Sequence, residues 1–128
     1  MSFSLTKEAI IGQRKTVTRR QGWAKLKVGS IIQPIEKGMG LKKGEKQKLL
    51  GCPIIITSIE EEAIEEITID DVACEGFDGF TTEQFIAMYC KANKVKPSEM
   101  CRVIRFEYVE KLELHDAAYQ EYLLTHSE

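Results

Sequence analysis

Apolar and polar residues alternate most regularly near the end of the chain. From Met100 to Val109 the sequence MCRVIRFEYV places Ile104, Phe106 and Tyr108 at every second position, which predicts a strand with one face in the core. The run Ile54-Ile55-Ile56 is too short and too β-branched to indicate a helix and predicts a buried strand. Both patterns therefore indicate strands of a sheet.

Two weaker strand signals lie earlier in the chain. Residues 15 to 20 alternate as a strand does, and a turn at Gln21-Gly22 follows them. Residues 27 to 35 (KVGSIIQPI) predict another strand, and Pro34 places it at a sheet edge or marks its end. Between residues 38 and 48 (GMGLKKGEKQK), three glycines and four lysines occur without apolar periodicity. We expect this segment to be an exposed, mobile loop.

Capping residues and glycines mark the predicted helix ends. Thr6 precedes a short apolar run that stops at Gly12, and the segments TIDD at 68–71 and TTEQ at 81–84 have the form of capping boxes. The helices predicted from these signals and from the apolar spacing of the tail cover residues 6–12, 68–76, 81–96 and 115–125. Helices inserted between strands predict an α+β fold around a small, curled sheet of mixed strands.

Composition bounds the class of protein. The chain has 128 residues, 43% of them hydrophobic and 30% charged, as in an ordinary globular domain. No apolar run approaches the roughly 20 residues that cross a bilayer, and the first residues lack the features of a secretory signal. We therefore expect a soluble, cytoplasmic protein without membrane attachment. The four cysteines form no C-x-x-C pair and both histidines lie far from them, so we expect free thiols, no metal site and no cofactor.

The charges are distributed unevenly. Residues 1–50 contain twelve Lys and Arg against three Glu, a net charge of +9, whereas residues 51–128 contain six against seventeen acids, a net charge of −11. A basic half suggests a surface that binds polyanions. The alternative is that the two halves neutralise each other in the folded protein.

Three residues are candidates for chemistry. Glu75 occupies the last turn of a predicted helix, where the helix dipole disfavours a carboxylate by up to about 1 kcal/mol unless the side chain is solvated. Lys15 and Thr18 belong to the basic stretch RKTVTRR and converge only if the chain turns or bulges there, because strand residues three apart face opposite sides. A lysine whose pKa is lowered by burial or nearby cations can activate a threonine, but a solvated basic strand would also explain the stretch.

Trp23, the single tryptophan, follows the basic stretch. It is a candidate for stacking on a base and equally for packing in the core. We expect partial burial with one ring edge available.

Several segments together resemble the ASCH domain family of the PUA-like superfamily, in its small stand-alone form from bacteria and bacteriophages. They are RKTVTRRxGW followed by LKVG, the loop EKGMGLKKGEK, DVxxEGF and the strand VIRFEY, at residues 14–29, 36–46, 71–77 and 103–108. The resemblance implies a small PUA-like β-barrel with flanking and inserted helices over residues 1–110. Residues 111–128 would form a C-terminal helical tail outside it.

The resemblance also implies function. Members of the family are considered RNA-binding, and one bacterial branch is an amidohydrolase that removes the acetyl group from 4-acetylcytidine. Its proposed catalytic lysine, threonine and glutamate correspond to Lys15, Thr18 and Glu75. The chain departs from that branch where Arg19-Arg20 follows Thr18 and Ser30 follows Gly29.

Three hypotheses follow. The first is binding of RNA or a modified nucleoside in a basic cleft, the second is deacylation of a modified cytidine, and the third is an adaptor that binds a protein through the acidic half and the tail. For the first, the expected ligand-binding residues beside the catalytic set are Arg14, Arg19, Arg20, Trp23, Lys42 and Lys43. Lys46 and Lys48 are expected to guide the nucleic-acid backbone.

Overall fold

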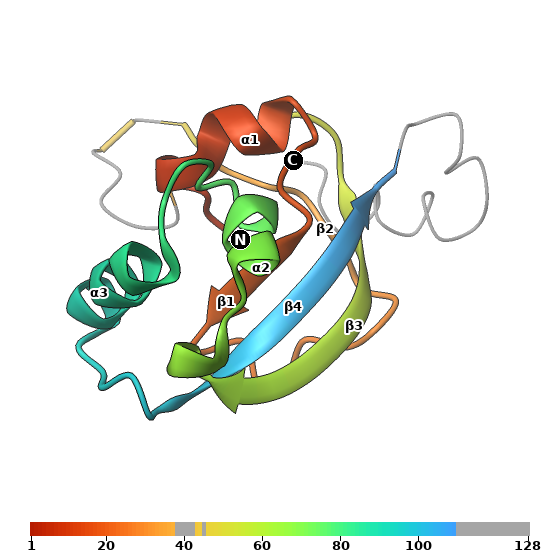
Figure 1. Ribbon diagram of the computed structural model, residues 1–128. Coiled ribbons are helices and arrows are strands. Elements are labelled where there is room, and N and C mark those ends of the chain that lie inside the picture. The colour runs from red at the N-terminus through yellow and green to blue at the C-terminus, as the bar shows by residue number, and fades with distance from the viewer. Residues whose placement is uncertain (38–42, 45, 110–128) are drawn as a thin grey trace.

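One curled antiparallel sheet organises the chain (Figure 1). The computed structural model describes residues 1–37, 43–44 and 46–109. The strands follow the order β1-β4-β3-β2 across the sheet. Their bounds are Val17–Arg20 for β1, Ile31–Ile32 for β2, Ile54–Ala63 for β3 and Met100–Tyr108 for β4.

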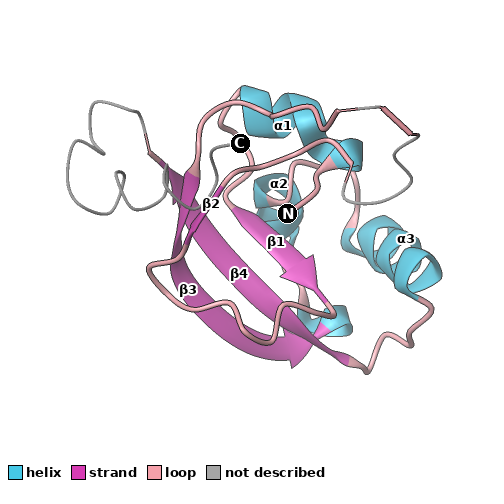
Figure 2. Cartoon of the chain, turned by 180° about the vertical axis from the view of Figure 1, so that it is seen from behind, coloured by secondary structure: helices cyan, strands magenta, loops and turns pink. Residues whose placement is uncertain are grey.

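Strand β4 lies between β1 and β3 and contributes apolar side chains to the core on both of its faces. Ile104 and Phe106 point into one hydrophobic cluster, which the N-terminal segment covers with Phe3, whereas Val103 and Cys101 point into the cluster on the other face. The pairing of β3 with β4 shifts register between Ile56 and Ser58, and such a bulge bends and twists a sheet. Seen from behind, the connection between β1 and β2 crosses the curved strands (Figure 2).

The helices lie around this sheet. Helix α2 lies against the face that is in front in Figure 1, with α3 beside it and α1 above. The bounds of the helical segments are Ser4–Thr6 for η1, Lys7–Ile11 for α1, Ile64–Glu66 for η2, Ile69–Cys74 for α2 and Thr82–Asn93 for α3. None is long and apolar enough to cross a membrane, within the part of the chain that the structure describes.

The predicted helix caps are confirmed for α2 and α3. The Thr68 hydroxyl accepts a hydrogen bond from the Asp71 N–H, and Thr81 and Gln84 form a complete capping box. The prediction for α1 is wrong in one detail, because a 3-10 turn precedes the helix and the Thr6 side chain makes no capping bond.

The α+β class is confirmed, with corrections to the sheet. All four strands pair antiparallel, so the prediction of mixed directions is wrong; within the described residues, parallel pairing occurs in the isolated bridge between Ser2 and Ile35. The strand predicted over residues 27–35 shrinks to Ile31–Ile32 and that bridge. Conversely, β3 continues from the predicted isoleucines through an acidic run to Ala63.

Some predictions fall on residues that the structure does not describe. They concern most of the lysine-rich loop, including Lys42, the domain boundary at residue 110 and the C-terminal helix. All four cysteines are described, and none forms a disulfide.

Candidate functional site

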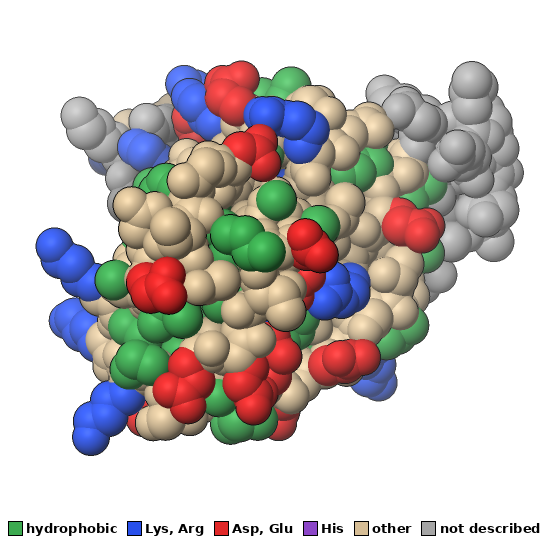
Figure 3. Space-filling view, viewed as in Figure 1, with side chains coloured by type: hydrophobic (Ala, Val, Ile, Leu, Met, Phe, Trp, Pro, Cys, Tyr) green, Lys and Arg blue, Asp and Glu red, His purple; other side chains and the backbone are tan. Residues whose placement is uncertain are grey.

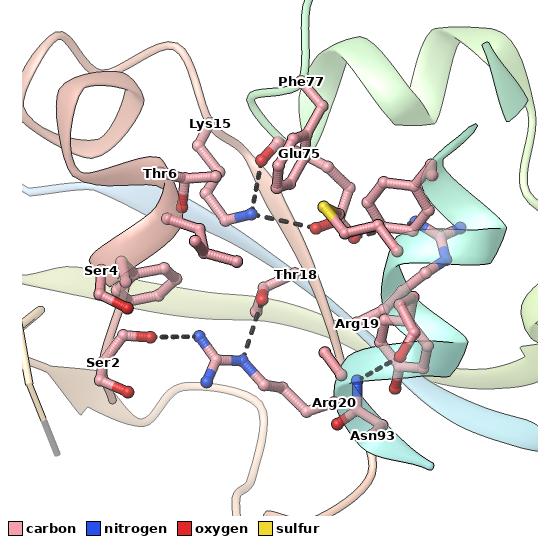
Figure 4. Close-up of a pocket in the computed structure, with 16 residues that line it drawn as sticks. Ser2, Ser4, Thr6, Lys15, Thr18, Arg19, Arg20, Glu75, Phe77 and Asn93 are labelled. Atoms are coloured by element: carbon pink, nitrogen blue, oxygen red, sulfur yellow. Dashed lines mark hydrogen bonds and ion pairs between the residues drawn. The ribbon is translucent and has the colours of Figure 1, made fainter. Parts of the chain in front are cut away.

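A pocket of about 230 Å³ lies between the N-terminal segment, β1, the end of α2 and α3 (Figure 4). Hydrogen-bonding side chains line one part of it, and aromatic and apolar side chains line the rest. The polar part of the lining includes the side chains of Lys15, Thr18, Arg19, Arg20 and Glu75 and the backbone of Ser2. The apolar wall comprises Phe3, Phe77, Phe85, Met88 and Tyr89.

Lys15 and Glu75 form a buried ion pair at this pocket. The Lys15 ammonium donates to Glu75 Oε1 over 3.0 Å and to the Glu75 backbone carbonyl over 2.6 Å, and both residues are 3% exposed. Glu75 follows directly after the last residue of α2, so its carbonyl is at the negative end of the helix. One ammonium therefore compensates both the helix end and the carboxylate, which explains how Glu75 is tolerated there.

Burial governs the protonation of Lys15. Removal from water lowers the pKa of its ammonium, the charge and hydrogen bond of Glu75 oppose that change, and Arg20 and Arg19 lower the pKa further. Together these effects lower the pKa of Lys15 below its ordinary value. A lysine in this state loses its proton more readily than one in water.

Gly76 allows α2 to end close to α1. Its φ of +92° favours glycine, and an added Cβ would lie 2.8 Å from the Ala9 Cβ. On the other side of the contact, the backbone N–H of Lys15 donates to the Ala9 carbonyl over 3.2 Å. The approach of the two helices thus brings Glu75 to Lys15.

Arg19 is occupied by carboxylates. Its side chain is fully buried, and its guanidinium contacts Glu62 at 2.5 Å, Asp71 at 2.8 Å and Glu75 at 3.2 Å. Burial alone would lower the pKa of this guanidinium, but the hydrogen bonds to Asp71 and Glu62 and the charge of Glu75 raise it. Arg19 therefore holds Glu75 in place, although the sequence suggested that it would contact a ligand.

Thr18 and Arg20 meet at the pocket from the same strand. The Thr18 oxygen accepts from Arg20 Nε over 3.0 Å, and Arg20 Nη2 donates to the Ser2 carbonyl over 2.6 Å. Strand β1 begins only at Val17, so Lys15 precedes the regular strand and the two candidate catalytic residues both reach the pocket. Thr18 lies between the Lys15–Glu75 pair and Arg20 (Figure 4).

The aromatic wall was not identified as part of a site from the sequence. The rings of Phe77 and Phe85 meet edge to face at 5.5 Å, and the Tyr89 hydroxyl donates to Gln21 over 2.7 Å. The apolar stripe of α3 that contains Phe85 and Tyr89 predicts that these side chains are buried. The same spacing occurs whether such a stripe only packs in the core or also lines a pocket, so the pattern does not reveal the site. The sequence of residues 2–6 shows no signal of a functional site.

Three expected ligand-binding residues lie outside the pocket lining. Arg14 is exposed and approaches Asp78 at 3.6 Å, and Lys43 is exposed. Trp23 is exposed at 39%, more than the expected partial burial, and has no place in the lining. Lys46 and Lys48 are also exposed at the surface.

Part of the charge asymmetry is neutralised in the fold. Arg14, Lys15 and Arg19 all pair with carboxylates from the acidic half of the chain. Figure 3 shows acidic side chains gathered over the lower part of the face that carries α2. Of the cations in the basic stretch, Lys15 and Arg19 are therefore internal, whereas Arg14 stays exposed.

The curled sheet and its surrounding helices form an α+β fold similar to that of an ASCH domain. No protein-family model and no curated protein matches the sequence. Among solved structures, the protein EF3133 from Enterococcus faecalis V583, of family DUF984, is similar with a TM-score of 0.57 and 16% identity over 81% of this chain and 69% of that one. An ASCH domain from Lactobacillus crispatus JV V101 is similar with a TM-score of 0.51 and 15% identity over 81% and 70% of the two chains.

Proposed function

We propose that the pocket binds one nucleoside, either free or as part of RNA. The observation that carries this proposal is the pairing of buried hydrogen-bonding groups with an aromatic wall in one pocket. Bases are recognised by stacking on aromatic side chains and by hydrogen bonds to their edges. The volume of about 230 Å³ is below the roughly 300–1,000 Å³ of pockets for drug-sized ligands, which favours a ligand about the size of one base or nucleoside.

The polar groups retain hydrogen-bonding capacity for such a ligand. Each oxygen of Glu75 has one cation partner, Lys15 on Oε1 and Arg19 on Oε2, and a carboxylate oxygen can accept two hydrogen bonds. Thr18 accepts from Arg20, which leaves its own O–H free to donate. The pocket therefore offers both acceptors and a donor to the edge of a base.

Calorimetric titration with the four ribonucleosides and 4-acetylcytidine tests the proposal. Thr18→Val removes a hydroxyl from the pocket, and Thr16→Val is its matched control because Thr16 is exposed and outside the lining. We expect binding of at least one nucleoside, a five- to tenfold loss in Thr18→Val, as for one neutral hydrogen bond, and no loss in Thr16→Val. Absence of binding by every nucleoside would refute the proposal.

We propose hydrolysis of an N-acetylated cytidine as the second candidate. It is favoured by the presence of Lys15, Thr18 and Glu75 at the same pocket and by the lowered pKa of Lys15. The neutral lysine would take the hydroxyl proton of Thr18 as its oxygen attacks the acetyl carbon. That proton would then pass to the departing amine of cytidine, and water would release acetate from the threonine ester. Glu75 would orient the lysine.

Conversion of 4-acetylcytidine to cytidine, followed by absorbance, tests this second candidate. Turnover should rise with pH as Lys15 loses its proton, because only the neutral amine acts as a base. Lys15→Met and Thr18→Val should each abolish turnover, whereas Thr16→Val should retain it. A protein that binds 4-acetylcytidine without converting it between pH 6 and 10 would be a binding protein only.

A further inference from the structure

The charges around the pocket divide into a balanced cluster and one additional cation. The balanced cluster is continuous through ion pairs and contains three cations and three carboxylates, namely Lys15, Arg19, Arg105, Glu62, Asp71 and Glu75. Arg20 lies next to this cluster and forms no ion pair with any described residue. Among these side chains, Arg20 thus carries the one positive charge that no carboxylate balances.

The contacts of Arg20 hold it in one position without neutralising it. Its guanidinium donates to the Thr18 oxygen and the Ser2 carbonyl and lies 4.9 Å from the centre of the Phe3 ring. These partners carry no charge, and Nη1 has no hydrogen-bond partner among the described residues. Burial lowers the pKa of Arg20, with only partial opposition from Glu75 and Tyr89.

A largely desolvated guanidinium without a counter-ion is unfavourable, because protein dipoles replace its hydration only in part. Its planar fork is suited to an oxyanion, and here it is ordered before any ligand binds. We infer that Arg20 is a subsite for a phosphate group attached to the ligand, so that the pocket prefers a nucleotide to a nucleoside. This inference rests on the proposed function for the base and adds the anion.

The positions of the polar groups support a ligand with two different ends. The Lys15–Glu75 pair lies towards one end of the pocket and Arg20 with Ser2 towards the other, with Thr18 between them (Figure 4). The first end offers a donor and acceptors that balance each other in charge, which suits a neutral base edge. The second end offers a cation that only an anion balances. A free mononucleotide and a phosphodiester in RNA share this chemistry.

The test compares the four ribonucleosides, their 5′- and 3′-monophosphates, inorganic phosphate and a short RNA oligonucleotide by calorimetry. We expect a monophosphate to bind about 10- to 100-fold more tightly than its nucleoside, the range of a charge-assisted hydrogen bond, and the preference to fall with added salt. Arg20→Met should remove the preference for a monophosphate, with nucleoside affinity measured in the same variant as a separate readout, and Arg20→Lys should retain part of the preference. Lys25→Met, which removes one exposed charge outside the pocket, should change neither.

The outcomes separate this inference from the proposed function. Equal affinity for nucleoside and monophosphate would overturn the anion subsite while the nucleoside site stands. Inorganic phosphate that binds through Arg20 without any nucleoside binding would support the anion subsite and refute the nucleoside site. Tighter binding of the oligonucleotide than of every mononucleotide would identify RNA as the source of the phosphate. Circular dichroism of each variant confirms folding. If Arg20→Met does not fold, Arg20→Gln takes its place, and an unchanged preference in a folded variant without the charge overturns the inference.

Discussion

Replacement of Glu75 by glutamine tests the central ion pair with almost no change in shape. The two oxygens of Glu75 accept from different cations, Lys15 over 3.0 Å and Arg19 over 3.2 Å. Glutamine has one acceptor oxygen and one NH₂ group, so the NH₂ must face one of the two cationic donors. The substitution therefore removes a charge and creates a donor–donor contact inside the protein.

We expect Glu75→Gln to lower the free energy of unfolding at pH 6 by about 3 kcal/mol. Breaking a buried ion pair by removal of one partner costs about 3–5 kcal/mol. The lower end applies here because Lys15 keeps the carbonyl of residue 75 at 2.6 Å and Arg19 keeps Glu62 and Asp71. Such a loss is a large fraction of the 5–15 kcal/mol that usually stabilises a domain.

The cost should depend on pH through Lys15. Without the charge of Glu75, the folded-state pKa of Lys15 falls further below its ordinary value, while the unfolded chain keeps that value. At a pH between the folded-state and the unfolded-state pKa of Lys15, the unfolded state binds more protons than the folded state, so the free energy of unfolding rises with pH. Because the folded-state pKa is lower in the variant, this rise begins at a lower pH in the variant than in the wild type. The difference in stability should therefore be greatest at low pH and shrink as pH rises through the folded-state pKa of the variant.

Urea unfolding followed by far-ultraviolet circular dichroism between pH 6 and 9.5 measures this difference. The double variant Lys15→Met/Glu75→Gln should recover part of the lost stability and lose the additional pH dependence, because no buried amine remains. If Glu75→Gln lowers the free energy of unfolding by less than about 1 kcal/mol at every pH, water screens the Lys15–Glu75 pair as it does an ion pair at the protein surface. Additive effects of the two substitutions would likewise refute the coupling.

Three further predictions concern stability and reactivity. Gly76→Ala should lower the free energy of unfolding by at least about 2 kcal/mol, because the new Cβ adds backbone strain and meets Ala9. Gly79→Ala is the control, since Gly79 has a similar φ of +86° and a Cβ there would have no atom within 4 Å, and it should lower the free energy of unfolding by about 1 kcal/mol in the same urea experiment. Equal losses in the two variants would show that the contact with Ala9 relaxes. Thr81→Ala should lower the stability by about 1 kcal/mol in thermal unfolding through loss of the capping box, and an unchanged melting temperature would contradict this. Burial raises the pKa of Cys101 to about 11, so its thiol should resist a thiol reagent at pH 8 in the native protein and react in urea, as mass spectrometry can show.

The local sequence predicts those elements whose signals lie within a few residues. The capping residues Thr68 and Thr81 mark the true starts of α2 and α3, and the alternation in β4 appears as expected. The second half of β3 has no such signal, because its run of glutamates shows no apolar alternation. It is a strand because it pairs with β4 in register, Glu62 opposite Cys101, and because Glu62 binds Arg19.

The same limit applies to the site. Glu75 is recognisable from the sequence because a carboxylate at a helix end contradicts a local preference. Arg19 and Arg20 are adjacent and chemically identical, so no local pattern distinguishes the arginine that is neutralised from the one that is not. Their roles depend on Glu62 and Asp71 for Arg19 and on Ser2 for Arg20, all distant in sequence.

The arrangement of charges is difficult to explain by stability alone. Well-packed apolar residues in place of a buried ion pair are often neutral or stabilising, so the buried part of the cluster, formed by Lys15, Arg19 and Glu75, is a costly way to fill the space beside a small sheet. The cluster fixes one carboxylate and one amine at a pocket and leaves the guanidinium of Arg20 without a counter-charge. The hydrogen bonds to Thr18 and Ser2 and the contact with the Phe3 ring hold this cation in a pocket of nucleoside size but do not neutralise it, and for this reason Arg20 is the residue whose substitution tells most about the ligand.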